Sequence, residues 1–425
     1  MDATPGVRDP NVPASPSMQN ILIIGYVWPE PNSSAAGSRM MQLVEFFLAQ
    51  SWTVTFASAA APSSHMADLD SLGVHKATIE LNNSSFDKYI RQLAPDLVLF
   101  DRFMIEEQFG WRVAKHCPNA LRLLDTEDLH CLRNARHRAL KANRKISTED
   151  LNSEMAIREV AAILRCDLSL VISQFEMGLL TDHYGVSSDL LLHLPFLLPN
   201  ISSETFIPFE QRSGYISIGN FRHAPNWDAV LHLKNTIWPL IRAQHPQAQL
   251  HVYGAYPPPK ATKLHNPRQG FLVEGWAEDA HRAMSQARVC LAPLRFGAGL
   301  KGKLIDAMRS GTPSVTTSVG AESMHGNLPW SGAIEDDPQQ FADAAVRLYQ
   351  DPEQWQRAQG NGRAIISQCY DEAQLGKRLL NGLNELRRTL TAHRLNNFTG
   401  AMLQHHTMQS TRYMAQWIEA KSKPN

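Results

Sequence analysis

The sequence has no excess of charge of either sign. Its 425 residues include 41 Lys and Arg and 41 Asp and Glu, so the formal net charge is zero. Proteins dedicated to nucleic acids usually carry a basic excess, and this balance therefore argues against nucleic acid as a partner. Apolar residues make up 43% of the chain and charged residues 19%, which is typical of a globular, soluble protein rather than a disordered one.

Cysteine is scarce, and its positions give no pattern. The five residues are far apart: Cys117, Cys131, Cys166, Cys290 and Cys369. Their spacing fits neither a disulfide framework nor a metal site, so a reducing cytosol is the plain interpretation.

Long apolar runs are also missing. No uninterrupted stretch approaches the ~20 residues of a membrane span. Residues 1–20 are rich in Pro, Ser and Asp and lack the apolar segment of a signal peptide, so we interpret them as a flexible leader. We expect a cytoplasmic protein, with peripheral contact at the inner face of a membrane left open.

Short apolar runs alternate with segments of helical spacing, which predicts an α/β fold. Strands are expected at residues 21–26, 52–57, 97–100, 120–124 and 168–172, and again at 215–218, 250–253, 271–273, 289–292 and 314–317. The length favours two domains. Three prolines (Pro195, Pro199, Pro208) and no helical period mark residues 191–208 as the connection. We expect one Rossmann-like domain over 21–199, a second over 200–375 and a helical segment over 376–425.

The most informative stretch runs from Arg295 to Met324 and reads RFGAGLKGKLIDAMRSGTPSVTTSVGAESM. A loop with Gly297, Gly299 and Gly302 precedes Lys303 and a short amphipathic helix with Asp306. Glycines let the backbone approach a ligand, and the first turn of a helix offers free N–H groups and a positive dipole end. Such loops bind phosphate. Asp306 can accept hydrogen bonds from hydroxyls, so the segment suits a nucleotide sugar.

In chain order, LIIGYVWPEPNSSAAGSR, DTEDLH, VISQFE, LPN, GNFRHAPN, GWAED, FGAGLKGKLIDAM and TTSVGAE resemble the retaining glycosyltransferases of the family-4 (group 1) type. That resemblance implies the GT-B architecture, two facing Rossmann-like domains. It also implies transfer of a sugar from a nucleotide-diphosphate sugar on the C-terminal domain to an acceptor on the N-terminal one. The acceptor would be a glycan, a lipid-linked molecule or a protein, and no metal or other cofactor is expected.

The resemblance also assigns residues. Lys303 matches the family's basic residue at the diphosphate, and Asp306 stands where the family has the second Glu of a Glu-x7-Glu pair, near the ribose. Gly37 and Arg222 are expected at the phosphates, Gly275 and Trp276 at the nucleotide base, and Glu322 at the sugar. The first Glu of the pair falls at Ala298, so we expect backbone N–H groups of Gly297 and Gly299 to take over part of its role. Asn220 occupies a position that is usually basic.

Catalytic candidates follow the strand at 120–124, where the segment DTEDLH places ionisable groups at a strand end. His130 or Asp128 could orient or deprotonate an acceptor hydroxyl, and Lys303 would stabilise the leaving group. Each residue also has a purely structural interpretation. Asp125 and Asp128 could cap the following helix, and His130 could bond to nearby backbone. Arg222 could be an interdomain salt-bridge partner, and the glycines could serve only to form a turn.

Other functions stay open at this point. A nucleotide-sugar epimerase could use the same scaffold, and the missing Glu at position 298 keeps a catalytically weak sugar-nucleotide-binding subunit in view. A dinucleotide oxidoreductase is disfavoured, because no Gly-x-Gly-x-x-Gly follows the first strand. A basic run could be a solvated helix face, or could meet an anionic acceptor or a membrane: Arg133, Arg136, His137, Arg138, Lys141, Arg144 and Lys145.

Overall fold

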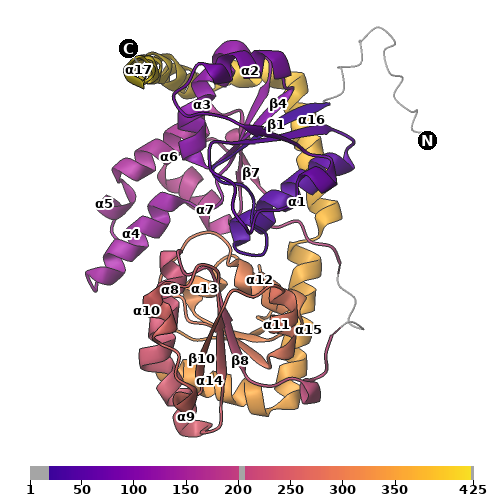
Figure 1. The fold of residues 1–425 in the computed structure, drawn as a ribbon, viewed down its shortest axis with the longest axis vertical. Coiled ribbons are helices and arrows are strands. Elements are labelled where there is room, and N and C mark those ends of the chain that lie inside the picture. The colour runs from indigo at the N-terminus through magenta and orange to yellow at the C-terminus, as the bar shows by residue number, and fades with distance from the viewer. Residues whose placement is uncertain (1–18, 201–205, 423–425) are drawn as a thin grey trace, which may run out of the picture.

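The computed structural model describes residues 19–200 and 206–422 and consists of two α/β domains, one above the other in Figure 1. Each domain has one sheet, and every strand pairing in both sheets is parallel. Residues 1–18 of the expected leader lie outside the described residues. The predicted fold of two facing Rossmann-like domains is therefore confirmed.

The N-terminal sheet has the order β3-β2-β1-β4-β5-β6-β7. Its central strands are buried apolar runs such as the fully buried Leu97–Asp101, because helices cover both faces. The strands are β1 Asn20–Gly25, β2 Thr53–Ser58, β3 His75–Thr78, β4 Leu97–Asp101, β5 Leu121–Asp125, β6 Leu168–Val171 and β7 Leu191–His193. The helices are α1 Ala35–Ala49, α2 Ser85–Leu93, α3 Phe103–His116, α4 His130–Lys141, α5 Thr148–Leu151, α6 Glu154–Arg165 and α7 Gln174–Gly178.

The C-terminal sheet has the order β10-β9-β8-β11-β12-β13. Its strands are β8 Tyr215–Ile218, β9 Leu250–Tyr253, β10 Phe271–Gly275, β11 Val289–Ala292, β12 Ser314–Thr316 and β13 Gly332–Ile334. Its helices are α8 Ala224–His232, α9 Trp238–Gln244, α10 Pro259–Thr262, α11 Ala280–Gln286, α12 Gly302–Arg309, α13 Ser318–Ala321, α14 Pro338–Gln350 and α15 Pro352–Cys369. In both sheets the order reverses beside the first strand of the domain, which is where ligands bind in such folds.

Two predictions about chain connections need correction. Residues 191–193 form the edge strand β7 and pair with β6 through Leu192 and Leu170, so the connection between the domains begins after this strand. The helical segment expected over 376–425 begins earlier, at Glu372, where α16 Glu372–Asn396 follows a short break after α15.

The chain crosses between the domains twice, and the two crossings touch. The backbone N–H of Leu198 donates to the carbonyl of Tyr370 at 2.8 Å, and the N–H of Glu372 donates to the carbonyl of Leu198 at 3.0 Å. Beyond this point α16 returns to the N-terminal domain, where Leu379 and Leu383 are fully buried. The last helix, α17 Phe398–Ser422, lies on the same domain against α3 and α6.

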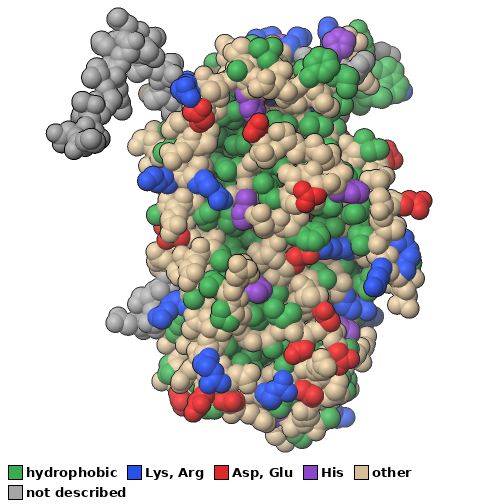
Figure 2. Space-filling view, turned by 180° about the vertical axis from the view of Figure 1, so that it is seen from behind, with side chains coloured by type: hydrophobic (Ala, Val, Ile, Leu, Met, Phe, Trp, Pro, Cys, Tyr) green, Lys and Arg blue, Asp and Glu red, His purple; other side chains and the backbone are tan. Residues whose placement is uncertain are grey.

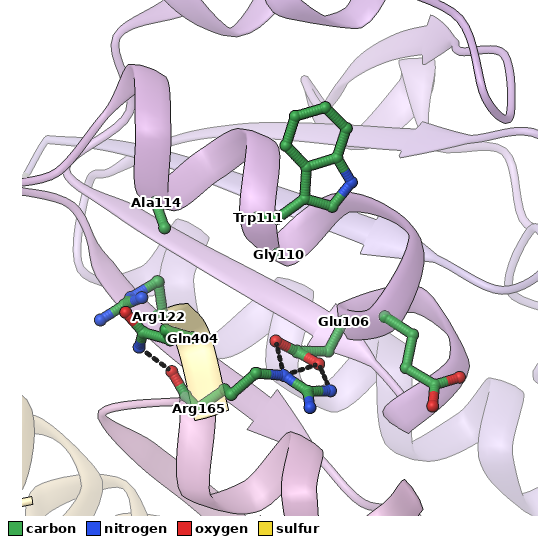
Figure 3. A pocket seen from close by; sticks show the side chains of 8 residues that line it. Glu106, Gly110, Trp111, Ala114, Arg122, Arg165 and Gln404 are labelled. Carbon is green, nitrogen blue, oxygen red and sulfur yellow. Dashed lines mark hydrogen bonds and ion pairs between the residues drawn. The ribbon is translucent and has the colours of Figure 1, made fainter. Parts of the chain in front are cut away.

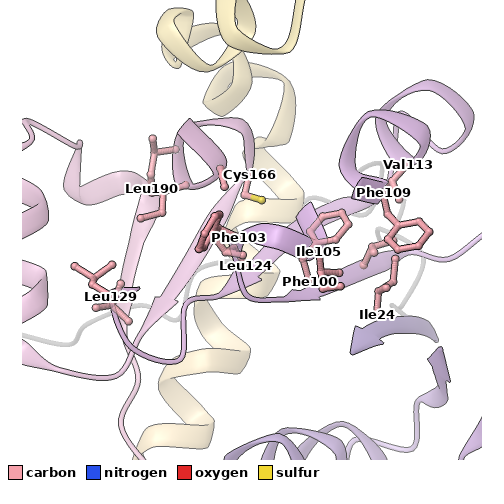
Figure 4. Packing of buried hydrophobic residues seen from close by; sticks show 14 of the residues in the cluster. Ile24, Phe100, Phe103, Ile105, Phe109, Val113, Leu124, Leu129, Cys166 and Leu190 are labelled. Atoms are coloured by element: carbon pink, nitrogen blue, oxygen red, sulfur yellow. The ribbon is translucent and has the colours of Figure 1, made fainter. Parts of the chain in front are cut away.

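The N-terminal domain has an apolar cluster on each face of its sheet. One contains Ile24, Phe100, Phe109 and Leu124 and packs under α3, as Figure 4 shows. Among the described residues, no helix is both long and apolar enough to cross a lipid bilayer. Charges of both signs are spread over the face in Figure 2, in keeping with the zero net charge.

Candidate functional site

Two helix N-termini meet between the domains. Gly302 begins α12 and Ala35 begins α1, and a Cβ added to Gly302 would lie 2.5 Å from the Cβ of Ala35. A helix start carries unpaired N–H groups and a positive dipole end. In α1 one of these, the N–H of Gly37, is capped at 3.0 Å by the hydroxyl of Ser34. The remaining N–H groups of both first turns give the cleft a positive potential that suits phosphate.

Lys303 adds a full charge next to these helix starts. A Cβ added to Gly219 would lie 2.9 Å from the Nζ atom of Lys303. It would also come close to the Asn226 side chain. Gly219 directly follows β8, so the absence of a side chain there opens the strand end to the ammonium group. Burial lowers the pKa of Lys303 to about 8, so the amine is mostly protonated at pH 7 and titrates just above it.

A pocket in the cleft brings Gly37 and Arg222 together from opposite domains. The guanidinium of Arg222 lies over the ring of Tyr256, with 3.6 Å between its carbon and the ring centre. Tyr256 in turn donates from its hydroxyl to both carboxylate oxygens of Glu30 at 2.9 Å. Arg222 forms a cation–π contact here rather than an interdomain salt bridge. The pocket is lined by Val27, Trp28, Pro29, Glu30, Ser34, Ala36, Gly37, Met40, Asp101, Arg102, Asn220, Arg222 and Tyr256.

Gly37 is required by packing at this pocket. A Cβ at this position would lie 2.3 Å from the carbonyl oxygen of Glu30, so only glycine allows α1 to pack on the preceding loop. A residue that the packing requires thus also lines the pocket, and its contact with the phosphates stays a prediction.

The positions expected at the nucleotide base lie at the end of β10. Gly275 has a φ of +84°, which suits glycine. Trp276 is 39% exposed, its indole N–H donates to the carbonyl of Asn32 at 3.2 Å, and its ring lies 4.5 Å from that of His65. This contact ties the tryptophan to the N-terminal domain. Asp306, in the second turn of α12, has a side chain that is 37% exposed and lies 4.0 Å from Nε2 of His281.

The glycine loop is buried against the N-terminal domain. The carbonyl of Gly297 accepts from Nη1 of Arg136 at 2.8 Å, and the Glu322 carboxylate accepts from both Nη atoms of the same arginine at 2.8 and 2.7 Å. The ring of Phe296 stacks on His137 with 4.3 Å between ring centres. Two predicted donor residues, Gly297 and Glu322, are thus held by one arginine of α4.

Gly299 makes the closest approach to the acidic loop. Its φ is +61°, a backbone conformation that favours glycine. A Cβ added to Gly299 would lie 2.8 Å from the Cβ of Asp128. Its N–H donates to Oε1 of Glu176 at 2.9 Å. We expected this N–H to replace a missing glutamate at the donor sugar, but in this structure it donates to the buried Glu176 side chain of the N-terminal domain.

The catalytic candidates Asp128 and His130 adjoin each other at the start of α4. Their Oδ1 and Nε2 atoms are 3.6 Å apart, and Asp128 also pairs with Arg133. Burial lowers the pKa of His130 to about 4, so the imidazole is neutral at pH 7. Although burial alone would raise the pKa of Asp128, Arg133 and His130 lower it below its ordinary value. Asp128 is therefore a carboxylate.

Neither carboxylate of the DTEDLH segment that was considered as a cap has that role. The first N–H groups of α4, from His130 and Cys131, donate to Glu159 at 2.8 and 2.7 Å. Asp125 instead forms a fully buried pair with Arg39, 2.8 Å apart. Glu159 lies 29 residues along the chain from His130, so local sequence gave no signal for this cap.

Arg102 is a site residue that sequence reasoning missed. It follows β4 and lines the cleft pocket with φ and ψ of 73° and 158°, a region that is otherwise almost confined to glycine. Its Nε lies 3.6 Å from Oδ1 of Asp101, and its guanidinium lies over the Tyr26 ring. Backbone strain of this kind gathers at functional sites, but the arginine itself follows an ordinary apolar strand and has no motif.

Part of the basic run over residues 133–145 is neutralised by the protein's own acids. Besides the pairs of Arg133 and Arg136, Arg144 pairs with Asp150.

A second cavity lies between α3, α6 and α17 and is lined by paired charges such as Arg165 with Glu106 (Figure 3). No predicted site residue lies among its lining residues.

Comparison with known proteins agrees with this architecture. Residues 212–351 match the family model described as "Glycosyl transferases group 1". A search of curated proteins found no match.

Solved structures share the fold at low identity. Sucrose-phosphate synthase from Thermosynechococcus elongatus is 18% identical with a TM-score of 0.63, covering 88% of this chain and 99% of that one. HepE from Anabaena, solved with UDP and glucose, is 13% identical with a TM-score of 0.65, covering 87% and 100%. A variant of TarM from S. aureus, solved with fondaparinux, alpha-GlcNAc-glycerol and UDP, is 12% identical with a TM-score of 0.56. The match covers 70% of this chain and only 58% of TarM.

Residues 212–351 are thus a group 1 glycosyltransferase domain. The predictions of the GT-B fold and of a glycosyltransferase are confirmed.

Proposed function

We propose that this glycosyltransferase moves a sugar from a nucleotide-diphosphate sugar to a hydroxyl of a glycan acceptor, with retention of configuration at the anomeric carbon. The observation that carries the proposal is the position of Lys303, in the first turn of α12 beside the start of α1. Two helix starts and one ammonium group form a preorganised site for the charge that develops on a leaving diphosphate.

The proposed reaction breaks the bond between the anomeric carbon and the diphosphate oxygen and forms a bond from that carbon to the acceptor oxygen. The acceptor proton passes to an oxygen of the leaving phosphate, and the nucleoside diphosphate departs. Lys303 and the helix N–H groups stabilise its negative charge. Asp128 and the neutral His130 would orient the acceptor hydroxyl from the N-terminal side, which suits transfer without a strong protein base.

We also propose that no metal ion takes part. The chain has one Asp-x-Asp spacing, at Asp68 and Asp70. Asp70 pairs with Lys76, and Asp68 accepts from the N–H of Ser71, so both carboxylates are engaged locally. In this proposal the positive charge comes from Lys303, with Arg222 as a second contributor. Turnover should therefore persist in EDTA.

The test is a panel of nucleotide sugars, starting with UDP-glucose because HepE has also been solved with UDP-glucose. A donor should raise the melting temperature and release nucleoside diphosphate when a glycan acceptor is present. The variant Lys303→Ala should keep its melting temperature without donor and lose at least about 100-fold in kcat/KM. Binding of every donor without any transfer would favour a non-catalytic subunit, and conversion of donor alone would favour an epimerase.

A further inference from the structure

Glu176 is a fully buried glutamate, 0% exposed, that contacts the site loops of both domains. It lies on α7, just after β6. Its Oε1 atom accepts from the N–H of Leu129 and from the N–H of Gly299, both at 2.9 Å. One oxygen atom thus joins the N-terminal domain to the glycine loop of the C-terminal domain.

The two amides belong to the segments that carry the candidate chemistry. Leu129 lies between Asp128 and His130, and Gly299 lies four residues before Lys303. The carbonyl of Gly299 is held as well, because Nζ of the buried Lys301 donates to it at 2.6 Å. Since a side chain at Gly299 would collide with Asp128, the two segments meet at a distance that only glycine allows.

An ionisable side chain is a costly group at this buried position. Its second oxygen, Oε2, has no hydrogen-bond partner among the described residues, and a buried polar atom without a partner destabilises the fold. Burial, together with the charge of Asp128, raises the pKa of Glu176 to about 8. A methionine would fill a similar volume without these costs, so the acceptor atom rather than the packing explains the residue.

We infer that Glu176 is a positioning residue, which fixes the glycine loop against the Asp128–His130 segment when the two domains are closed. Its effect on turnover rests on the proposed function. Its effect on the two loops does not, because the hydrogen bonds exist in the protein alone.

Glu159 offers a matched control. It is also a buried glutamate that accepts two backbone N–H groups, those of His130 and Cys131, but both lie in its own domain. The variants Glu176→Met and Glu159→Met each remove one such acceptor and keep the volume. Glu176→Gln keeps an oxygen that can accept from both amides and removes only the ionisable group.

Amide hydrogen exchange of the full-length protein tests the inference. In Glu176→Met we expect faster exchange in peptides covering both 126–132 and 296–301, whereas Glu159→Met should affect only the first. Glu176→Gln should exchange like the wild type in both. Unchanged exchange at 296–301 in Glu176→Met, or equal effects of Gln and Met, would overturn the inference, and the Gln variant keeps the comparison valid if the Met variant folds poorly.

Kinetics with a donor from the panel provides the second measurement. Glu176→Met should lower kcat by about 10- to 100-fold, because small misplacements of reacting groups cost this much. UDP binding, measured by calorimetry, should change less than twofold, since Lys303 and α12 are untouched. Glu176→Gln should restore kcat. A wild-type protein that transfers no sugar would contradict the proposed function and leave the exchange data to decide this inference, whereas an active wild type with an equally active Met variant would overturn it.

Discussion

The ammonium group of Lys303 lies beside Gly219, so close that a Cβ on this glycine would stand 2.9 Å from it. The two residues are 84 positions apart, and each belongs to a different βα unit of the C-terminal domain. Gly219 therefore serves Lys303 by leaving room at the end of β8. This relationship makes the glycine a sensitive probe of the phosphate site.

Replacing Gly219 by alanine should weaken donor binding. The new methyl group would lie 2.7 Å from Cγ of Asn226 as well as near Lys303, so both side chains must move. We expect at least about a tenfold loss of UDP affinity, equivalent to ~1.4 kcal/mol, measured by calorimetry. Gly382→Ala in α16 is the control, because nothing lies within 4 Å of a Cβ there. Equal UDP affinity in the two variants would contradict the assignment.

Donor binding should weaken at alkaline pH. The pKa of Lys303 is lowered to about 8 by burial, so its positive charge is present below that pH and lost above it. The affinity for UDP should fall as the pH rises through about 8. The variant Lys303→Arg, whose guanidinium stays charged, should not show this loss even if its affinity is lower. A pH-independent wild type would exclude Lys303 from the diphosphate site.

The acid limb of the rate profile should report His130. Burial lowers the pKa of this imidazole to about 4, so the neutral form persists well below pH 6. If neutral His130 orients the acceptor, kcat/KM should stay level from pH 7 to about 5 and fall as the pH approaches 4. His130→Ala should lower kcat/KM at pH 7 by about 100-fold. A fall centred near pH 6.5 in the wild type would point to another group.

The buried pair of Arg39 and Asp125 should contribute strongly to the unfolding free energy of the protein. The guanidinium and carboxylate approach to 2.8 Å with both side chains buried, and Nη1 of Arg39 also donates to the carbonyl of Leu194. Arg39→Met leaves a buried carboxylate unpaired and should cost about 3 to 5 kcal/mol of unfolding free energy, measured by urea denaturation. The double variant with Asp125→Leu should regain much of this loss. A double variant less stable than the single one would contradict this account.

Sequence periodicity was sufficient for the central strands and for the edge strand β10, but it missed the edge strands β3, β7 and β13. Runs such as Leu97–Asp101 carry a strong apolar signal because both faces of a parallel sheet are covered. The edge strands His75–Thr78 and Leu191–His193 are short and partly exposed, so their residues resemble loops. Their pairing depends on partners more than 15 residues away.

The candidate site also has residues that a local motif reveals and residues that only the folded structure reveals. The glycine loop and Lys303 form a continuous motif, and the resemblance carried by that motif led to their interpretation. Glu176 and Glu159 act through neighbours that are distant in sequence, and Arg102 follows an ordinary apolar strand, so no spacing could reveal these three residues. Glu322 and Gly297 were expected at the donor, and their shared contact with Arg136 could be recognised only with both domains in place.

The paired crossings at Leu198 and Tyr370 constrain how such a molecule can move. Two chain segments joined by hydrogen bonds resist twisting and sliding past each other, yet they can bend together about a shared axis. The two domains should accordingly open and close by hinge bending about one axis rather than by rotation about several axes. Each closure would then restore the same contacts between the two domains.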